Sequence, residues 1–326
     1  MNFLITGATG FIGQNLVKRL VEDGHKCRCL VRESSVINSL KKLTNIELFY
    51  GDIAQKLTLT DICKGIDIVI NSAGMLGKWN STIENLRPVN ANGINNLADE
   101  IVRNKVEYVI HLSAGGVTGP VKGQAADETY ICRPRTPYEK TKWEGEKCAL
   151  SLFEKLKVPI VVVRPTFTYG PGDPHKLPLF RTVKSGRFAF IGSGESTNHP
   201  VYVDDLVSGI ILLLKKRAIG ETFIIGGPRP ITKKELIYVI AGELGVKKSF
   251  AHLPRWLATS GAIFMVLLAR LLDFEPILSP SRVSAMADSW GYSIKKANTI
   301  LGYTPKVDIK TGVRKTVQAY YNLGWL

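Results

Sequence analysis

Thr6-Gly7-Ala8-Thr9-Gly10-Phe11-Ile12-Gly13 lies between the apolar run 3–5 and a stretch of helical period at 12–22. Glycines at the spacing of 7, 10 and 13 leave room where a Cβ would block a tight turn, the approach of a phosphate, or the packing of a helix on a strand. The first turn of such a helix presents free N–H groups to an anion. A strand, this turn and a helix in succession predict a site for the pyrophosphate of a dinucleotide.

Short β-branched runs alternate with longer stretches of helical period through the first half of the chain. The runs lie at 3–5, 27–31, 66–70, 108–112 and 160–163, and the helical stretches at 12–22, 93–104 and 138–156. Continuous apolar runs are typical of strands that are buried on both faces. The alternation predicts an α/β fold with a doubly wound parallel sheet of the Rossmann type.

The pattern loosens after Arg164-Pro165, where a Gly/Pro-rich segment at 169–174 leads into short mixed elements. We therefore predict a dinucleotide-binding Rossmann domain at 1–165 and a smaller, mixed, mainly substrate-binding lobe at 166–326. One strand-like run, Thr222-Phe223-Ile224-Ile225, is expected to return to the main sheet.

Composition narrows the class of protein. The 326 residues are 45% hydrophobic and carry a formal net charge of +15, but the basic residues are dispersed and form no aromatic-basic motif. We therefore expect a small-molecule substrate and no nucleic acid. The five histidines show no chelating spacing, so no metal site is expected. The five cysteines form no Cys-x-x-Cys pair, and we interpret them as reduced thiols. Because no signal-peptide pattern precedes the first strand, we expect a cytoplasmic protein.

An apolar stretch at 256–272 carries no charge from Trp256 to Ala269. It is shorter than the roughly 20 residues that a membrane-spanning helix needs. Its apolar residues cover most of the helix circumference, so we expect it to be buried beneath the C-terminal lobe. Peripheral contact with a membrane and a homodimer interface are the alternatives.

Tyr138 and Lys142 are four residues apart in a helical stretch, which places them on one helix face. A tyrosine with a pKa near 10 exchanges protons poorly at neutral pH, but a neighbouring ammonium favours its phenolate. We predict that Tyr138 is the acid or base of a hydride transfer and that Lys142 lowers its pKa.

These two motifs together resemble the extended short-chain dehydrogenase/reductase family, which includes NAD-dependent epimerases and dehydratases and enzymes like 3β-hydroxysteroid dehydrogenase. The resemblance continues through Arg164-Pro165, Tyr169-Gly170-Pro171, the segment 199–205 and the C-terminal segment 295–305, and so covers nearly the whole chain. It implies an NAD(P)-dependent enzyme that interconverts an alcohol and a carbonyl.

The resemblance also implies roles for individual residues. Cofactor contacts are implied for Gly7, Thr9, Gly10, Phe11, Ile12, Gly13, Arg32, Asp52, Ile53, Ala73, Gly74, Asn90, Tyr138, Lys142 and Pro165. Asp52 and Ile53 would flank the adenine, Asn90 would support the loop after the fourth strand, and Lys142 would bond the nicotinamide ribose. Substrate contacts are implied for Tyr169, His199 and Val201.

The residues after the second strand, Arg32-Glu33-Ser34-Ser35, bear on the choice of cofactor. An arginine at this point can pair with a 2′-phosphate, whereas an acidic residue accepts from a free ribose hydroxyl. Arg32 favours NADP, and Glu33 leaves NAD as the alternative.

The family's third catalytic member is a hydroxyl at the end of the fifth strand. Matching Val117-Thr118-Gly119 to the family's closing triplet places that position on Ala114, with Ser113 one residue earlier. Neighbouring strand residues point to opposite faces, so Ser113 can substitute only where the strand ends or bulges. We hypothesise that Ser113 or a water supplies the missing hydrogen bond.

Three functions follow from these residues. The segment 73–79 and the apolar stretch at 256–272 resemble the 3β-hydroxysteroid dehydrogenase branch, which implies a sterol-like or lipid-like substrate. A nucleotide-sugar epimerase with bound NAD is the first alternative, and cations such as Lys176 would suit its diphosphate. A catalytically degenerate cofactor-binding scaffold, marked by Ala114, is the second.

Overall fold

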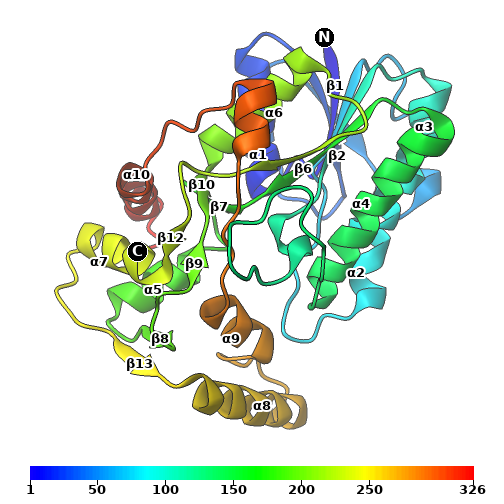
Figure 1. Ribbon diagram of the computed structural model, residues 1–326. Coiled ribbons are helices and arrows are strands. Elements are labelled where there is room, and N and C mark those ends of the chain that lie inside the picture. The colour runs from blue at the N-terminus through cyan, green and yellow to red at the C-terminus, as the bar shows by residue number, and fades with distance from the viewer.

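Seven parallel strands form the central sheet of the computed structural model, which describes residues 1–326 (Figure 1). Their order is β11-β6-β5-β4-β1-β2-β3, so the predicted return of the run at 222–225 to the main sheet is present in the structure. The strands are β1 (Asn2–Thr6), β2 (Lys26–Val31), β3 (Ile46–Tyr50), β4 (Ile68–Asn71), β5 (Tyr108–Leu112), β6 (Ile160–Pro165) and β11 (Thr222–Ile225).

Helices cover both faces of this sheet. On one face lie α1 (Phe11–Glu22) and α6 (Val203–Lys216), and on the other lie α2 (Ile83–Asn90), α3 (Asn92–Arg103) and α4 (Pro137–Leu156). Alternate residues of β1 point to opposite faces of the sheet. Phe3 and Ile5 pack with α1 and α6, whereas Leu4 packs with α3 and α4. The predicted doubly wound α/β fold is confirmed.

The C-terminal lobe has a core of its own below the sheet in Figure 1. Its helices are α5 (Leu177–Lys184), α7 (Lys233–Glu243), α8 (Arg255–Leu272), α9 (Pro280–Ala287) and α10 (Ile309–Asn322). Its short strands pair as β7 (Phe167–Tyr169) with β10 (Pro200–Tyr202), β9 (Thr197–Asn198) with β12 (Ile231–Thr232), and β8 (Ala189–Ile191) with β13 (Ala251–Leu253).

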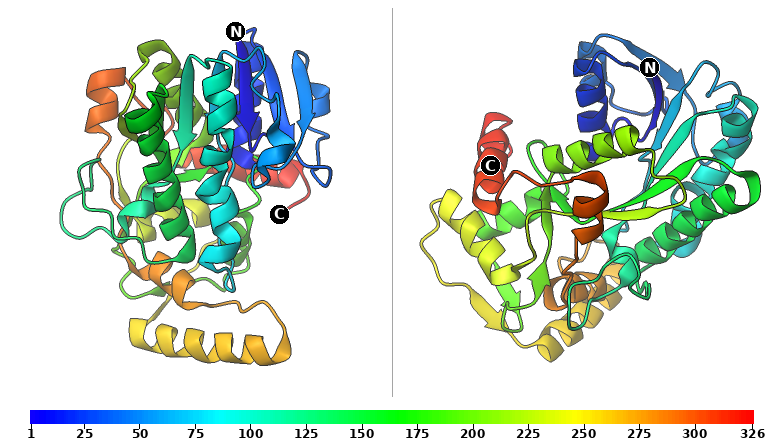
Figure 2. Two further views of the ribbon diagram at one scale, coloured as in Figure 1. Left: turned by 90° about the vertical axis from the view of Figure 1, so that its right-hand side faces the viewer. Right: turned by 45° about the horizontal axis from the view of Figure 1, so that its top comes forward.

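The apolar helix α8 lies at the surface, so the expected burial beneath the lobe is wrong. Only Ala258, Ala262 and Ala269 of this helix are buried. Figure 2 shows α8 lying across one end of the molecule, at the edge of the lobe. Burial fails because the face that the helix buries carries alanines, while most of its large apolar side chains are exposed.

Candidate active site

A cavity of about 490 Å³ opens at the carboxyl ends of β1, β4, β5 and β6, facing the C-terminal lobe. Ligands of open α/β sheets bind at this edge. The sheet side of the cavity is lined by Gly7, Gly10, Phe11, Ile12, Gly13, Ser72, Gly74, Leu76, Leu112, Ser113, Ala114, Gly115, Gly116, Tyr138, Glu139, Lys142 and Pro165. The lobe side is lined by Thr166, Phe167, Thr168, Asp173, His175, Lys176, Asn198, Ala285, Trp290 and Tyr292.

The turn between β1 and α1 requires glycine at two positions. Gly7 has φ of +67°, a left-handed conformation that side chains disfavour. A Cβ on Gly13 would lie 2.1 Å from the Gly7 carbonyl oxygen. Helix α1 begins at Phe11 without a side-chain cap, so its first N–H groups are left for an anion at the cavity wall.

Buried amides hold the loop that follows β4. The Thr6 hydroxyl donates to Asn71 Oδ1 at 2.6 Å, and the Asn71 amide lies 3.0 Å from His111 Nδ1. Asn90 accepts from the Met75 N–H at 2.7 Å and donates to the Met75 carbonyl at 3.0 Å. Asn90 therefore supports this loop from behind, while Gly74 of the same loop lines the cavity.

The fifth strand ends at Leu112, immediately before the predicted hydroxyl site. Ala114 is followed by a 3₁₀ turn, Gly115–Thr118, and both Ser113 and Ala114 line the cavity. The backbone N–H of Ser113 still donates to the Val163 carbonyl at 2.7 Å. The Ser113 hydroxyl is buried and has no partner within the protein, so it is available to a ligand.

Helix α4 begins at a fixed point just before the tyrosine. Thr136 and Glu139 form a capping box, and Pro137 occupies the first turn. Tyr138 and Lys142 both line the cavity from this helix, as their spacing predicts. The Lys142 ammonium donates to the Leu112 carbonyl at 2.5 Å, which ties α4 to the end of β5.

Burial shifts the pKa values of both members of this pair. Burial, with a smaller contribution from the neighbouring Glu139, raises the pKa of the Tyr138 phenol to about 12. Burial lowers the pKa of Lys142 to about 8, and Glu146 opposes that change. In the nucleotide-free protein the Lys142 ammonium donates to the Leu112 carbonyl, and burial dominates the pKa of Tyr138. A lowering of this pKa by Lys142 and a bound nicotinamide stays a prediction. At neutral pH Tyr138 is a phenol, which can donate a proton.

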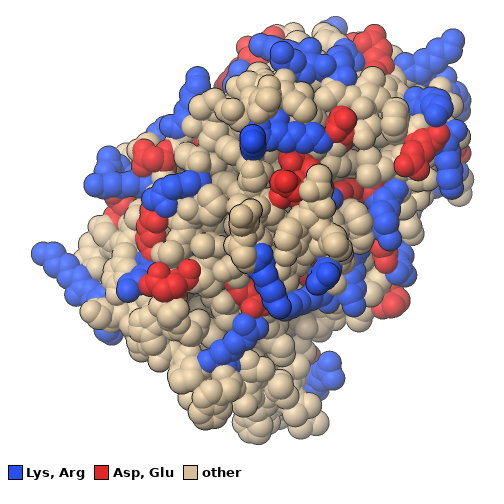
Figure 3. All heavy atoms as spheres, viewed as in Figure 1, with Lys and Arg blue, Asp and Glu red and all other residues tan.

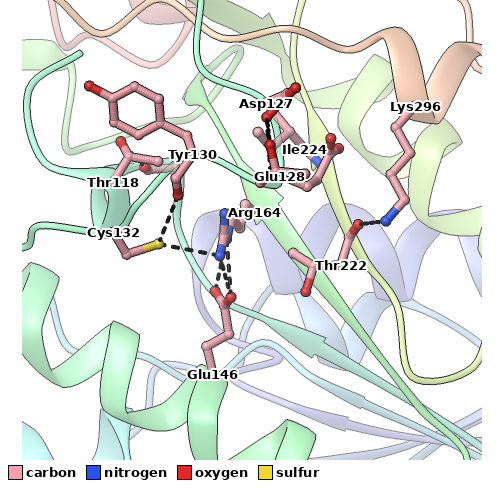
Figure 4. A network of polar contacts seen from close by, with 12 residues as sticks. Thr118, Asp127, Glu128, Tyr130, Cys132, Glu146, Arg164, Thr222, Ile224 and Lys296 are labelled. Carbon is pink, nitrogen blue, oxygen red and sulfur yellow. Dashed lines mark hydrogen bonds and ion pairs between the residues drawn. The ribbon is translucent and has the colours of Figure 1, made fainter. Parts of the chain in front are cut away.

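A buried ion pair lies one helical turn beyond Lys142. Arg164 on β6 donates to Glu146 on α4 at distances between 2.6 and 3.1 Å, and both side chains are almost completely buried. The same guanidinium lies 3.4 Å from Cys132 Sγ (Figure 4). This network joins α4 to the strand that leads into Pro165, and so fixes two walls of the cavity relative to each other.

Sequence reasoning missed most of the lobe side of the cavity. Trp290 and Tyr292 line it from a segment that is bonded between other loops: Trp290 N–H donates to Thr197, and Ala126 N–H donates to Gly291. Lys176 also lines the cavity, with its ammonium 4.5 Å from the centre of the Phe167 ring. No local pattern marks 290–292, because these residues reach the site only through long-range packing.

The three predicted substrate residues lie behind the cavity wall. Tyr169 is buried in the lobe core against Tyr202, and Val201 is fully buried in the core of the main sheet. His199 is buried with Nε2 2.8 Å from the Gly227 carbonyl, and its ring stacks on Tyr292. They do not line the cavity because the short strands β7 and β10, with their flanking turn, direct these side chains into the packed interior.

Several predicted cofactor residues also lie outside the cavity lining. Thr9 accepts from the Gln14 amide, and Ala73 packs against Gly7, so both shape the glycine turn. At the ends of β2 and β3, Arg32 is exposed, Asp52 forms a local turn through Ala54 N–H, and Ile53 is buried. Arg32, Asp52 and Ile53 therefore lie on the side of the glycine turn that is remote from Tyr138. The adenosine half of a dinucleotide would lie on that side.

The donor set fits a nicotinamide dinucleotide. The uncapped start of α1 suits the pyrophosphate, and the Cβ-free approach at Gly7 and Gly13 lets it come close to the backbone. Tyr138 and Lys142 lie on the cavity wall, whereas the exposed Arg32 follows β2, which lies on the other side of β1 from β4 and β5. Hydride chemistry would be supplied by the bound nicotinamide, and this chain's residues would orient it and handle the proton.

Residues 3–226 match the NAD dependent epimerase/dehydratase family. The chain is 27% identical to sterol-4-alpha-carboxylate 3-dehydrogenase, decarboxylating, of Mus musculus over 98% of this chain and 91% of that protein. It is 26% identical to 2-alkyl-3-oxoalkanoate reductase of Stenotrophomonas maltophilia over 97% and 98%.

The fold is also that of UDP-glucuronic acid 4-epimerase from Bacillus cereus, solved with UDP-glucuronic acid and NAD. The TM-score is 0.80 at 24% identity, and the match covers 99% of this chain and 100% of that one. A family match over most of the chain accords with the glycine turn and with the Tyr138–Lys142 pair at the cavity. The chain therefore belongs to the NAD-dependent epimerase/dehydratase family, and it is a nicotinamide-dependent enzyme of the extended short-chain dehydrogenase/reductase type.

Proposed function

We propose that this enzyme reduces a lipid-like ketone, or oxidises the corresponding alcohol, with NADP. The observation that carries the proposal is the joint placement of Tyr138, Lys142 and the unpartnered Ser113 hydroxyl on one cavity wall. Trp290 and Tyr292 face them from the lobe and offer an aromatic surface to an apolar substrate. Two relatives, a sterol dehydrogenase and an oxoalkanoate reductase, support a substrate of this class.

The proton chemistry follows from the protein's own groups. In the direction of reduction, the carbonyl carbon receives a hydride, and its oxygen receives the proton of the Tyr138 phenol. Ser113 donates a hydrogen bond to that oxygen, which stabilises the charge that develops on it. In the direction of oxidation, Tyr138 must first lose its proton, and a positively charged nicotinamide nearby would favour that loss.

The preference for NADP rests on Arg32. Its side chain is exposed after β2 and has no ion-pair or hydrogen-bond partner in the protein, so a 2′-phosphate can take it. Ser35 holds this turn: its N–H donates to the Arg32 carbonyl at 2.9 Å, and its Oγ accepts from the Arg32 N–H at 3.1 Å. Glu33, also exposed, supports NAD as the alternative. We expect Arg32→Ala to weaken NADPH binding about tenfold or more and to leave NADH binding nearly unchanged.

A nucleotide-sugar epimerase is the second candidate, and Lys176 favours it. This cation lines the cavity and would attract a diphosphate. Desolvation lowers its pKa, and Asp173 partly opposes that shift. Epimerisation would use the same Tyr138 but would return the hydride to the sugar, so no net cofactor would be consumed.

The test uses NADPH and NADH, a panel of lipid-like ketones and a panel of nucleotide sugars. We expect NADPH oxidation with at least one ketone, and a loss of that oxidation in Tyr138→Phe. Sugar interconversion without net cofactor oxidation would replace the proposal with the epimerase. Cofactor binding by the wild-type protein without turnover of either panel would favour a degenerate scaffold.

A further inference from the structure

Helix α8 buries small residues against the protein and exposes large apolar residues to solvent. Its buried residues are three alanines, whereas Trp256, Phe264, Leu267 and Leu271 are 70%, 64%, 53% and 79% exposed. By helical periodicity these four residues lie on the face opposite the alanines. These four large apolar side chains are therefore exposed to solvent in the protein.

The exposed apolar surface extends beyond the helix. Leu272, Phe274 and Ile277 are also exposed, and they follow α8 directly. Figure 3 shows this end of the molecule as an uncharged surface with basic side chains at its edge. A contiguous apolar surface of this kind marks a site of contact with a partner or a membrane.

The helix has the length and composition of a candidate membrane span, with a mean hydropathy of 1.4 over 18 residues. Both ends of this helix are nevertheless attached to the rest of the protein. Before it, β13 pairs with β8, and after it, α9 packs back against it through Val283. Ala258 and Ala262 contact the same cluster, so the helix lies along the protein surface and presents its side, as an interfacial helix does.

The surrounding charge selects a lipid surface over a second copy of this chain. Between 247 and 282 the basic residues are Lys247, Lys248, Arg255, Arg270 and Arg282, and the acidic residues are Asp273 and Glu275. Glu275 is paired with Arg282, and Arg255 with Asp288, whereas Arg270 has no ion-pair partner. A two-fold contact through α8 would bring two positive surfaces together, in chains that each carry +15.

We propose that α8 binds in the plane of an anionic membrane, with Trp256, Phe264, Leu267 and Leu271 in the acyl boundary and Arg270 at the headgroups. This surface borders the cavity, because α9 packs on α8 and contributes Ala285 to the cavity lining. The proposal does not depend on the substrate or on the cofactor preference.

The test is flotation of the full chain with two kinds of vesicle, one of phosphatidylcholine and one of equimolar phosphatidylcholine and phosphatidylserine. We expect flotation with the anionic vesicles, much less with the neutral ones, and a decrease as salt is added. The double variant Phe264→Glu/Leu267→Glu should not float. Arg270→Gln should weaken binding about fivefold.

Leu57→Glu is the matched control, because Leu57 is 90% exposed on another part of the surface. It should float as the wild-type protein does. Unchanged melting temperatures would show that all variants fold. Flotation of the double variant at the wild-type level, or failure of the wild-type protein to float, would overturn the proposal. A dimer that the double variant abolishes, without flotation of the wild-type protein, would assign the surface to a second copy instead.

Discussion

The Ser113 hydroxyl lies beside the position, Ala114, at which the resemblance places the catalytic hydroxyl. Strand β5 ends one residue before Ser113, and both Ser113 and Ala114 line the cavity. Its oxygen is buried without a partner, and a buried polar group in that state calls for a ligand. Ala114 lines the same cavity but has no polar group to offer.

We therefore expect Ser113→Ala to lower kcat about 10²-fold, because one donor to the developing oxyanion is lost. Tyr138→Phe should lower kcat by at least as much, about 10²- to 10⁴-fold. Both are measured by NADPH oxidation with the best substrate of the ketone panel. Ser208→Ala, on the exposed side of α6, is the control and should be neutral. Full turnover in Ser113→Ala, together with loss of turnover in Tyr138→Phe, would show that Ser113 does not supply the hydrogen bond and would favour a water in that role.

The buried Lys142 ammonium makes the free energy of unfolding depend on pH. Burial lowers its pKa from 10.5 to about 8, so between these pH values the unfolded chain binds more protons than the folded protein. Stability from this group therefore rises with pH across that window. The gain should be about 2 kcal/mol between about pH 7 and about pH 9.5.

Urea unfolding of nucleotide-free protein at the two pH values measures this effect. Lys142→Met should lack the gain, whereas Lys140→Met, exposed on the same helix, should keep it. An equal rise in the wild-type protein and in Lys142→Met would show that the buried ammonium is not responsible.

At the scale of elements, the contact between α4 and β6 depends on the buried pair of Glu146 and Arg164. Removing one partner leaves an uncompensated charge, so Arg164→Met should lower the free energy of unfolding by about 3–5 kcal/mol. Glu146→Met/Arg164→Met should recover most of that loss in urea unfolding. Arg314→Met, which breaks an exposed pair with Glu243, should cost less than about 1 kcal/mol. A double variant no more stable than Arg164→Met would mean that the pair does not account for the loss.

The elements that the sequence predicted are those whose character is local. The helix at 12–22 and the strands at 108–112 and 222–225 occur within a residue or two of their expected bounds, because apolar periodicity and turn residues determine them. The direction in which α8 presents its large residues was not predictable. A helix with apolar residues around most of its circumference gives no signal of which face the fold will cover.

In the site, too, the short-range motifs were predictable from the sequence and the long-range contacts were not. The glycine turn and the pair on α4 are short-range motifs, and the structure brings both to the cavity. Trp290 and Tyr292 are separated from Tyr138 by about half the chain and reach the cavity only through the packing of loops. The resemblance placed Tyr169 and Val201 at the substrate, but their side chains pack into the interior. A motif match gives the position of a residue along the chain and not the direction of its side chain.

At the scale of the whole molecule, the last helix closes the lobe beneath the cavity. The Tyr320 hydroxyl on α10 donates to the Asp173 carbonyl at 2.6 Å, and Asp173 lines the cavity. The preceding segment is held to α6, since Asp205 accepts from the N–H groups of Lys306 and Val307 at 3.0 and 2.9 Å. The C-terminal segment therefore connects the sheet, the lobe and the cavity wall.

Gly312 tests this connection, because α10 approaches the Tyr169 ring most closely there. A Cβ at this position would lie 2.1 Å from Tyr169 Oη, and both residues are buried. Gly312→Ala must therefore displace α10 or the ring, and we expect it to lower the free energy of unfolding by about 1–3 kcal/mol. Gly242→Ala is the matched control in α7, since a Cβ there meets nothing within 4 Å. It should be neutral or stabilise by up to about 1 kcal/mol through helix propensity. Urea unfolding of the two variants separates close packing from propensity, and a stabilising Gly312→Ala would show that α10 does not depend on this contact.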